Sequence, residues 1–490
     1  MAVVAPYDKT TVPTARQLHM LDRFGCGWSR PAFTQLQNAG GELAWFEQQL
    51  APTSITESTT ADAVVSWFPG LRQAPEVIWS SDRTGVKRHW EYAIDLANCS
   101  LLRRIYSKRS LLESMVDFWS NHLHVDARSF PVFCQRPAYD DLLRSHALGR
   151  FSDLLVAATL HPAMLLFLDN YKSVRGAPNE NHGRELLELH TVGQDAGYTE
   201  QMVKDSAKIL SGWTVVSGYN PSTSPAWSRT YDPTRHTTGP VSVLGFTAAN
   251  AAPDGRVLTE QYLRYLASHP STARRIARKL AVRFVSDTPS EQLVSTLAQV
   301  FLDSGTDISA TLRALVASDE FWASAGAKVR TPIDDVVATC RTLRVTAQAP
   351  TSKSSFANAL SWTINSTLCF HWPRPDGPPD TADVWAAPTR MLNSWKMHWG
   401  LAGGYSPSQQ ATYLTPVSYL PQASIRFDRF VDHLCRVLLG RGSTSVLLDA
   451  ACEGTGTGVA EVVTADHAVI RWKFSRLVAV LLDSPEHMTR

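Results

Sequence analysis

The densest run of polar side chains in this 490-residue sequence is NENHGRELLELHTVG, residues 179–193. At about 100° per residue its leucines share one side of a helix, whereas Arg184, Glu185 and Glu188 share the opposite side. Glu185 and Glu188 are therefore neighbours, and if they are buried one of the two pKa values must rise. A proton donor then lies beside an acceptor, as general acid–base and glycosidic chemistry require. The alternative is a solvated helix face with an Arg184–Glu188 ion pair.

The same polar residues, together with nearby histidines, could instead form a metal site. His122 and His124, like Glu188 and His190, are two residues apart in the sequence. Imidazole and carboxylate groups could hold a divalent transition metal. Side chains at this spacing diverge by about 200° on a helix, so chelation requires that the helices end there. His122, Glu188 and His190 are the expected ligands if a metal is bound; the alternative is histidines satisfied at helix ends. No cofactor is predicted.

Amphipathic helices must position these side chains. The segment 110–123 begins with Ser110 and Glu113, which predicts a capping box, and its apolar stripe predicts that His122 points inward. Pro270 and Ser271 predict the start of a helix over 271–284, whose Arg- and Lys-rich face is explained by solvation and ion pairing. Further helices are expected around 86–106, 136–168, 199–211, 258–267, 289–324, 331–343, 382–400, 421–440 and 464–484.

The predicted fold class is mainly α, a multi-helical globular bundle. The chain is long for one core, so we expect two packed lobes, 1–328 with the His/Glu cluster and 329–490, with a soft boundary near 325–332. Turn formers and β-branched residues predict a small hairpin region near 213–247. The proline-rich stretch 366–380 is expected to be an ordered loop anchored by its aromatic residues.

Composition excludes several classes of protein. Charged residues make up 19% and the net charge is +2, so attraction to nucleic acid is not expected. The sequence shows no signal peptide and no transmembrane segment, which favours a soluble, cytoplasmic protein, although export with a companion stays open. The seven cysteines are scattered without a Cys-x-x-Cys pair, which indicates free thiols rather than disulfides or a zinc knuckle.

Several motifs together resemble a known family. NENHGRELLELHTVG and GYTEQMVKDSAKILSGWTV are joined by HMLDRFGCGWS, FWSNHLHV, HPAMLLFLDN, RHTTGPVSVLG, HPSTARRIARKLAVRFV, KVRTPIDDVVATCRTL and KFSRLVAVLLDSPEHM. Along the chain these motifs occur in the order expected for the family, and together they cover nearly its whole length. The sequence is similar to the bacterial family catalogued as "domain of unknown function 1800", which carries no established activity.

The resemblance implies which polar residues matter. It implies that the family's characteristic polar positions converge in one site, and here they are Asn121, His122, Asn181, Arg184, Glu185, Glu188, His190 and His236. His182 departs from the family pattern, in which an aromatic residue is more usual. The segment FHWPRPDGPPDTADVW is also a diverged version of a Pro-, Gly- and Trp-rich stretch.

Three hypotheses of function follow. In the first, an enzyme uses Glu185 and Glu188 for acid–base chemistry on a small molecule, a glycan or another polar polymer. Its other catalytic candidates are His122, His190 and His236, and its candidate substrate contacts are Asn121, Asn181, Arg184, Trp119 and Trp213. The second is a metal-dependent hydrolase or oxidoreductase. The third is a binding or assembly module with a buried polar network and an unknown protein partner.

Tryptophans offer a further candidate surface. The chain contains 15 Trp, most of which are expected in the core. Trp372, Trp385, Trp395 and Trp399 could form a platform on which sugar rings stack. Trp395 and Trp399 are one helical turn apart, however, and are expected to pack in the core.

Overall fold

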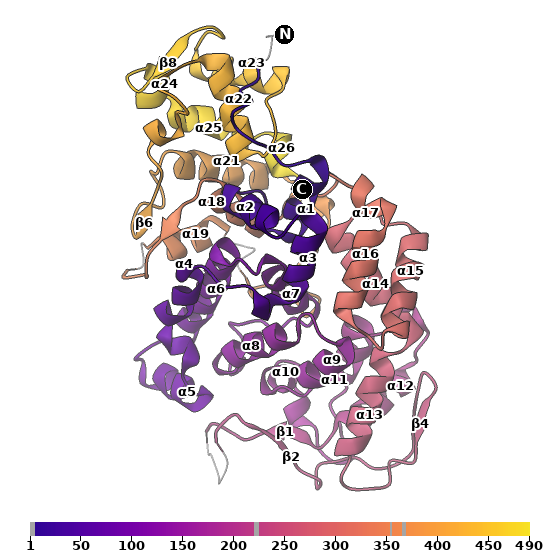
Figure 1. The fold of residues 1–490 in the computed structure, drawn as a ribbon. Helices are drawn as coiled ribbons and strands as arrows, with labels where there is room; N and C mark the ends of the chain where they lie inside the picture. The colour runs from indigo at the N-terminus through magenta and orange to yellow at the C-terminus, as the bar shows by residue number, and fades with distance from the viewer. Residues whose placement is uncertain (1–4, 220–224, 353–354, 365–368) are drawn as a thin grey trace.

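A computed structural model describes residues 5–219, 225–352, 355–364 and 369–490, and it confirms a mainly α-helical fold (Figure 1). The N-terminal helices are α1 (Ala15–Phe24), α2 (Arg30–Asn38), α3 (Glu42–Leu50), α4 (Thr59–Val64), α5 (Pro75–Thr84), α6 (His89–Tyr106), α7 (Ser110–His122), α8 (Arg136–His146), α9 (Phe151–Thr159), α10 (Pro162–Phe167), α11 (Glu180–Glu185) and α12 (Glu200–Leu210). A π-helical turn, Leu186–His190, continues α11.

The remaining helices follow the hairpin region. They are α13 (Arg256–Ala267), α14 (Pro270–Phe284), α15 (Glu291–Asp303), α16 (Ile308–Ala317), α17 (Asp319–Ala323), α18 (Pro332–Thr342), α19 (Phe356–Ile364), α20 (Ala382–Trp385), α21 (Pro388–Ala402), α22 (Phe427–Leu438), α23 (Ser445–Thr455), α24 (Ala468–Arg471), α25 (Phe474–Leu482) and α26 (Pro485–Met488). Helices therefore occupy the segments in which the apolar periodicity predicts them, whereas α1 to α5, α19, α23 and α26 lie outside those segments.

The strands form small antiparallel pairs. β1 (Trp213–Val215) pairs with β2 (Arg229–Tyr231), and β3 (Val241–Val243) pairs with β4 (Phe246–Ala248). These two pairs confirm the predicted hairpin region. Two more pairs lie in the C-terminal third: β5 (Thr346–Ala347) with β6 (Ala411–Thr412), and β7 (Ser424–Arg426) with β8 (Val462–Thr464).

Both expected helix caps are wrong in detail. Ser110 is already inside α7 and makes no capping bond, because Glu113 turns to Arg144, whose Nη1 is 2.6 Å from Oε1. α14 begins at Pro270, and the side chain of His269 accepts a hydrogen bond from the backbone of Ser271. Proline is well suited to the first helical position, so the cap moves back to the residue before it.

Two hydrophobic clusters form most of the core. The first contains buried side chains between Leu18 and Phe321. The second is built mainly from α18 to α25, but it also contains Val64 and side chains of α6 such as Leu101. The predicted boundary near 325–332 falls between α17 and α18, where the two clusters separate along the chain. Because α6 packs against α18 and α19 as well as α7, the C-terminal block is completed by an N-terminal helix.

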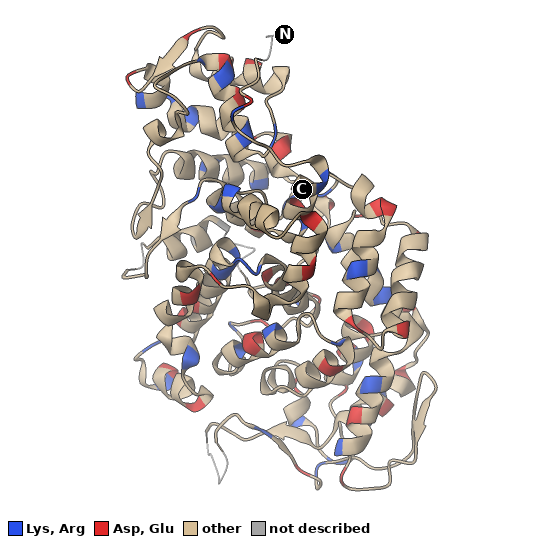
Figure 2. Ribbon diagram, viewed as in Figure 1, with Lys and Arg blue, Asp and Glu red and all other residues tan. Residues whose placement is uncertain are grey.

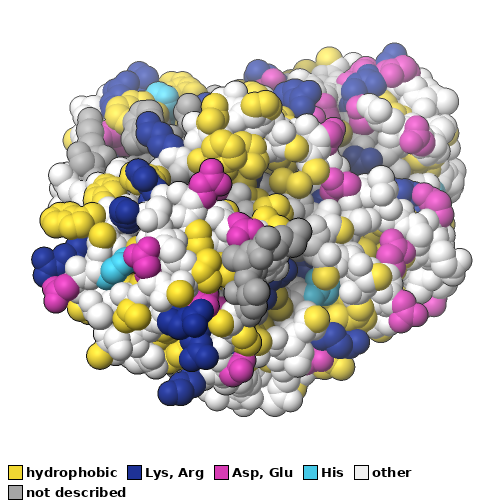
Figure 3. Space-filling model, turned by 90° about the horizontal axis from the view of Figure 1, so that it is seen from above, with side chains coloured by type: hydrophobic (Ala, Val, Ile, Leu, Met, Phe, Trp, Pro, Cys, Tyr) yellow, Lys and Arg dark blue, Asp and Glu magenta, His cyan; other side chains and the backbone are white. Residues whose placement is uncertain are grey.

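Charge and hydrophobicity are distributed without a dominant field. Acidic and basic residues are scattered over the helices of both blocks (Figure 2). On the face seen in Figure 3, the two signs of charge are interspersed among hydrophobic side chains. Among the described residues, none of the helices combines the length and the apolar character needed to cross a bilayer. All seven cysteines are free thiols, as predicted.

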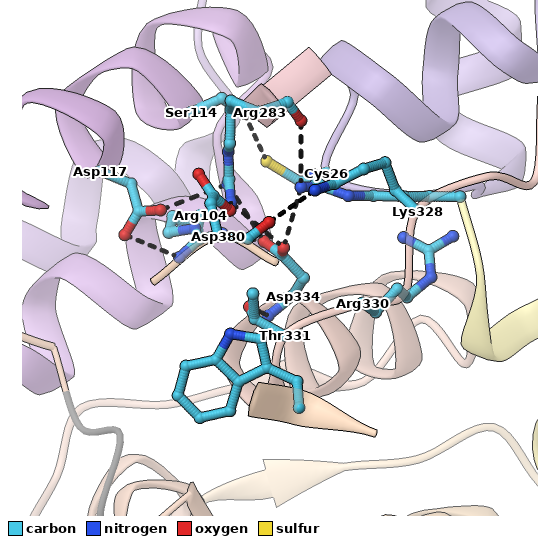
Figure 4. Close-up of polar contacts among 12 residues, drawn as sticks. Cys26, Arg104, Ser114, Asp117, Arg283, Lys328, Arg330, Thr331, Asp334 and Asp380 are labelled. Carbon is cyan, nitrogen blue, oxygen red and sulfur yellow. Dashed lines mark hydrogen bonds and ion pairs between the residues drawn. The ribbon is translucent and has the colours of Figure 1, made fainter. Parts of the chain in front are cut away.

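A buried ionic network joins the two blocks (Figure 4). Arg283 of α14 is 2% exposed and contacts three carboxylates: Asp380 at 2.8 Å, Asp117 of α7 at 3.3 Å and Asp334 of α18 at 3.4 Å. Arg104 of α6 bridges the same groups, 3.2 Å from Asp117 and 2.5 Å from Asp334. One cluster of charges therefore holds together four helices and the loop before α20.

Further cations complete this network. Arg490 Nη2 lies 3.4 Å from Asp334, and Lys328 pairs with Asp287 while donating to the carbonyl of Asp380 at 2.5 Å. A buried carboxylate is costly unless it is paired, so each cation compensates a charge that would otherwise destabilise the fold. Burial alone would raise the pKa of Asp334, but Arg283, Arg490 and Arg104 hold that pKa well below its usual value.

We predict that Asp334→Asn destabilises the protein by about 3–5 kcal/mol in urea unfolding, because it leaves buried guanidinium groups without their counter-charge. The matched control is Glu47→Gln, which removes an exposed pair with Arg313 and is expected to cost less than about 1 kcal/mol.

The same variant gives a pH test. Since the folded-state pKa of Asp334 is lowered, its stabilising contribution is complete above the unfolded value of 3.8 and is lost as the pH falls through the folded value. The difference between wild type and Asp334→Asn should therefore be constant above pH 3.8 and shrink below it. Equal stability of both proteins at neutral pH would contradict the prediction.

Candidate functional site

A cavity of about 430 Å³ lies between α7, α14 and the loop of residues 376–380. Leu189, at the end of the π-helical turn, forms another part of its wall. Its polar lining comes from Asn121 and His122 of α7, from Arg275, Arg278 and Lys279 of α14, and from Asp376 and Asp380 of the loop. Because Asp380 is also a partner of Arg283, the buried network forms one side of this cavity.

The basic residues of α14 differ in their partners. Arg274 and Arg278 both pair with Glu291 on the surface, and Arg283 is held in the buried network. By contrast, neither Arg275 nor Lys279 forms an ion pair with a carboxylate in the described part of the chain. Arg275 Nε donates to the carbonyl of Leu189 at 3.3 Å, and the pKa of Lys279 is lowered to about 8, by burial first and by Arg275 second.

His122 supports Lys279 from α7. Its Nε2 lies 3.1 Å from the backbone carbonyl of His190, and its Nδ1 lies 3.1 Å from Nζ of Lys279. A carbonyl can only accept, so Nε2 carries the proton and Nδ1 accepts from the lysine. Burial and then the charge of Lys279 keep the pKa of His122 well below its usual value, so the imidazole is neutral. The pair orients the ammonium group at the cavity.

Glu185 and Glu188 belong to α11 and to the π-helical turn that follows it; both are half-buried, and neither is among the residues that line the cavity. Burial and then the charge of Glu188 raise the pKa of Glu185, and Asp376 on the opposite loop adds to this rise. No hydrogen bond or ion pair to another described residue engages the Glu185 carboxyl. Glu188 instead accepts from Gln194 Nε2 and from the hydroxyl of Tyr198 at 3.5 Å. Glu185 therefore combines a raised pKa with a carboxyl group that no described residue engages.

The π-helical turn explains this arrangement. Wide turns of this kind interrupt regular helices and are frequent at functional sites. Here the turn places Glu188 on the side of Arg275, while Leu187 and His190 remain buried. His182 and His190 are fully buried, and their ring nitrogens have no hydrogen-bond partner among the described residues. Burial lowers the pKa of each to about 3, so both rings are neutral and pack as aromatic side chains.

Several predicted site residues lie elsewhere. Trp119 is buried in the core, where its Nε1 donates to the carbonyl of Ala147 at 2.9 Å. Arg184 pairs with Glu200 at 2.6 Å rather than with Glu188. Asn181 is exposed and donates to the carbonyl of Leu168 at 3.3 Å. Trp119 of α7 therefore has a structural role, whereas Arg184 and Asn181 of α11 have partners outside the cavity.

The hairpin region holds the remaining two candidates. His236 is buried, with Nδ1 2.9 Å from the carbonyl of Ser211 and Nε2 2.8 Å from Oδ1 of Asn250. Trp213 lies on β1 and donates to Thr259 Oγ1 at 3.2 Å. Neither residue lines the cavity of α7 and α14. Of the predicted residues, Asn121 and His122 line the cavity, and His190 contributes its backbone carbonyl to His122, whereas Glu185 and Glu188 lie outside the lining.

The tryptophan platform is also not formed. Trp395 and Trp399 of α21 are 42% and 41% exposed, so the expectation that they pack in the core is wrong. Their one-turn spacing marks a shared helix face, but this face points to solvent. Trp385 is buried, and Trp372 donates to Asp376 Oδ1 at 3.0 Å, which supports the loop at the cavity. Residues 366–368 of the expected loop lie outside the described residues.

The expected metal ligands His122, Glu188 and His190 do not meet through their side chains. Within the described ranges, the one group of three His, Cys, Asp or Glu side chains close enough to share an ion is Asp335, His398 and His487. This group lies in the C-terminal block.

Sequence reasoning missed the cations that face the cavity. Arg275, Lys279 and Arg283 follow one another at four-residue intervals, which places them on one stripe of α14. That four-residue spacing could have indicated a shared stripe of cations, whereas the basic face as a whole is typical of a solvated helix surface. The loop residues Gly377 and Asp380 carried no such signal because their partners are distant in the sequence.

The fold and the cavity define a mainly α-helical protein with a cation-lined site beside a π-helical turn. The chain belongs to the protein family of unknown function DUF1800, whose profile matches residues 19–489. A comparison with curated proteins found no match, and neither did a comparison with solved structures.

We predict that Gly377→Ala displaces the loop that closes the cavity. Gly377 has φ +71°, and a Cβ there would lie 2.1 Å from the backbone oxygen of Asn121. Gly176 has a similar φ of +82° and open space around it, so Gly176→Ala carries the backbone strain without the collision. In urea unfolding, Gly377→Ala should cost about 1–3 kcal/mol more than Gly176→Ala. Equal losses would show that this contact does not position the loop.

Proposed function

We propose that the protein binds an acidic glycan or a similar polyanionic polymer in the cavity of α7 and α14, and cleaves it by acid–base chemistry. The observation that carries this proposal is the presence of Arg275 and Lys279 at the cavity without carboxylate partners. Cations buried beside a cavity are destabilising unless an anion compensates them, and a ligand carboxylate or sulfate would do so. A volume of about 430 Å³ lies within the range of small-ligand sites.

The candidate proton donor is Glu185. Its raised pKa favours the protonated form, and Glu188, which accepts hydrogen bonds from Gln194 and Tyr198, is the neighbouring carboxyl group. In the proposed hydrolysis the glycosidic bond breaks as Glu185 protonates the oxygen of the leaving sugar, and a water molecule adds to the sugar carbon while Glu188 accepts the proton of that water. Arg275 and Lys279 hold the anionic group, His122 orients Lys279, and Asn121 contributes an amide for ligand hydroxyl groups. A neutral glycan would leave the two cations uncompensated and should bind poorly.

Binding should depend on pH through Lys279. Its pKa is lowered to about 8, so the ammonium form prevails below that pH and is lost above it. We predict that the affinity for uronate oligosaccharides, measured by isothermal titration calorimetry, falls as the pH rises through 8. In Lys279→Arg the charge persists at high pH, so this fall should disappear while binding at neutral pH is kept. An unchanged pH dependence in that variant would contradict the role of Lys279.

Turnover should depend on Glu185. We predict that Glu185→Gln lowers the kcat for an acidic oligosaccharide by about 10²–10⁴-fold, with little change in Kd, because only proton transfer is lost. Glu180→Gln, on the exposed side of the same helix, is the control and should keep full activity. Release of reducing ends is the measurement, with neutral oligosaccharides in parallel. Tight binding without any cleavage by the wild type would leave a binding module and reject the enzymatic part of the proposal.

A further inference from the structure

A second group of chemically capable side chains lies in the C-terminal block, apart from the cavity. Asp335 of α18, His398 of α21 and His487 of α26 are buried, with one ligand atom from each within 4.8 Å of the others. Two imidazoles and one carboxylate are a common ligand set for divalent transition metals. We propose that these three residues bind a metal ion of the zinc class.

The distances fit such an ion. Asp335 Oδ1 lies 3.0 Å from His398 Nε2 and 3.7 Å from His487 Nε2. Ligands bound at about 2.0–2.1 Å in a tetrahedral zinc site are about 3.3 Å from one another. The two separations lie on either side of this value, so shifts of a few tenths of an ångström would accommodate the metal.

Outer hydrogen bonds orient the ligand atoms. Asp483 Oδ1 lies 2.7 Å from His398 Nδ1, which leaves Nε2 directed at Asp335. Ser394 Oγ donates to Asp335 Oδ2 at 2.6 Å, and Arg390 lies 3.5 Å from that same oxygen, which leaves Oδ1 between the imidazoles. A carboxylate behind a histidine ligand is the usual support of a metal-binding imidazole.

The site has neighbouring oxygen and room for water. Thr339 Oγ1 lies 2.9 Å from His487 Nε2. Asp335 and Ser394 also line a cavity of about 230 Å³ between α18 and α21, which provides an entry path and space for a water as fourth ligand. Bound metal would join α18, α21 and α26.

A proton is the competitor of the metal. Asp335 and Asp483 lie 3.0 and 2.7 Å from the two ring nitrogens of His398, so a proton on Nε2 would occupy the position of the ion. A divalent ion must displace any proton from that nitrogen in order to bind. Without a metal, the same residues would form a buried ion pair.

Metal content of the full chain tests the proposal. Protein purified without a metal-affinity step and incubated with Zn²⁺ should hold about one ion after desalting, by elemental analysis. After a chelator has removed it, titration with Co²⁺ should produce the visible absorption of a four-coordinate site. Asp483→Asn is expected to weaken Co²⁺ binding by about 10–100-fold, and His487→Gln by more.

The control is His19→Gln. His19 is 4% exposed and hydrogen-bonded through Nε2 to the carbonyl of Phe321, so it matches the ligands in residue type and burial but lies in the other core. It should bind Co²⁺ like the wild type. Circular dichroism confirms that each variant is folded. Folded wild type that binds neither ion, or a folded His487→Gln variant with unchanged affinity, would overturn the proposal and leave the ion pair.

Discussion

Arg283 and its carboxylate partners are the interaction on which the arrangement of this protein depends. A guanidinium group has several donors in a fixed plane, so one side chain can bind carboxylates from α7, α18 and the loop before α20 at once. Nonpolar packing builds the two blocks, whereas the paired buried charges constrain the position of one block relative to the other. A small displacement of the blocks would leave a buried charge without its partner, which is costly.

The cavity is a consequence of this network. Asp380 is fixed by Arg283, and the loop that carries Asp380 meets α7 at Gly377, where only a residue without a side chain allows the contact. The basic residues on one face of α14 therefore have two different roles. Arg283 compensates internal carboxylates and stabilises the fold, whereas Lys279 and Arg275, about one and two turns earlier, line the cavity without ion-pair partners among the described residues. The proposed anionic ligand would supply the negative charge that Arg275 and Lys279 do not receive from an ion pair within the described chain.

Buried polar groups in the C-terminal block follow a different pattern. There Asp335 is matched by imidazoles, which can be neutral ligands or charged partners, rather than by guanidinium groups alone. The same geometry therefore serves a proton or a metal ion, and solution conditions decide between them. The buried ionic network and the Asp335 cluster share α18, in which the adjacent residues Asp334 and Asp335 contact Arg283 and His398, respectively.

The sequence alone determined the helical class, many helix positions, the hairpin region and the family, because these follow from local periodicity and contiguous motifs. It could not place Arg184, Trp119 or His236, whose partners are distant in the sequence. It also read the basic face of α14 as solvated, since periodicity does not reveal which charged side of a helix is covered. Only the tertiary structure decides which charged side chains are paired, because desolvation and ion pairing depend on neighbours that are distant in the sequence.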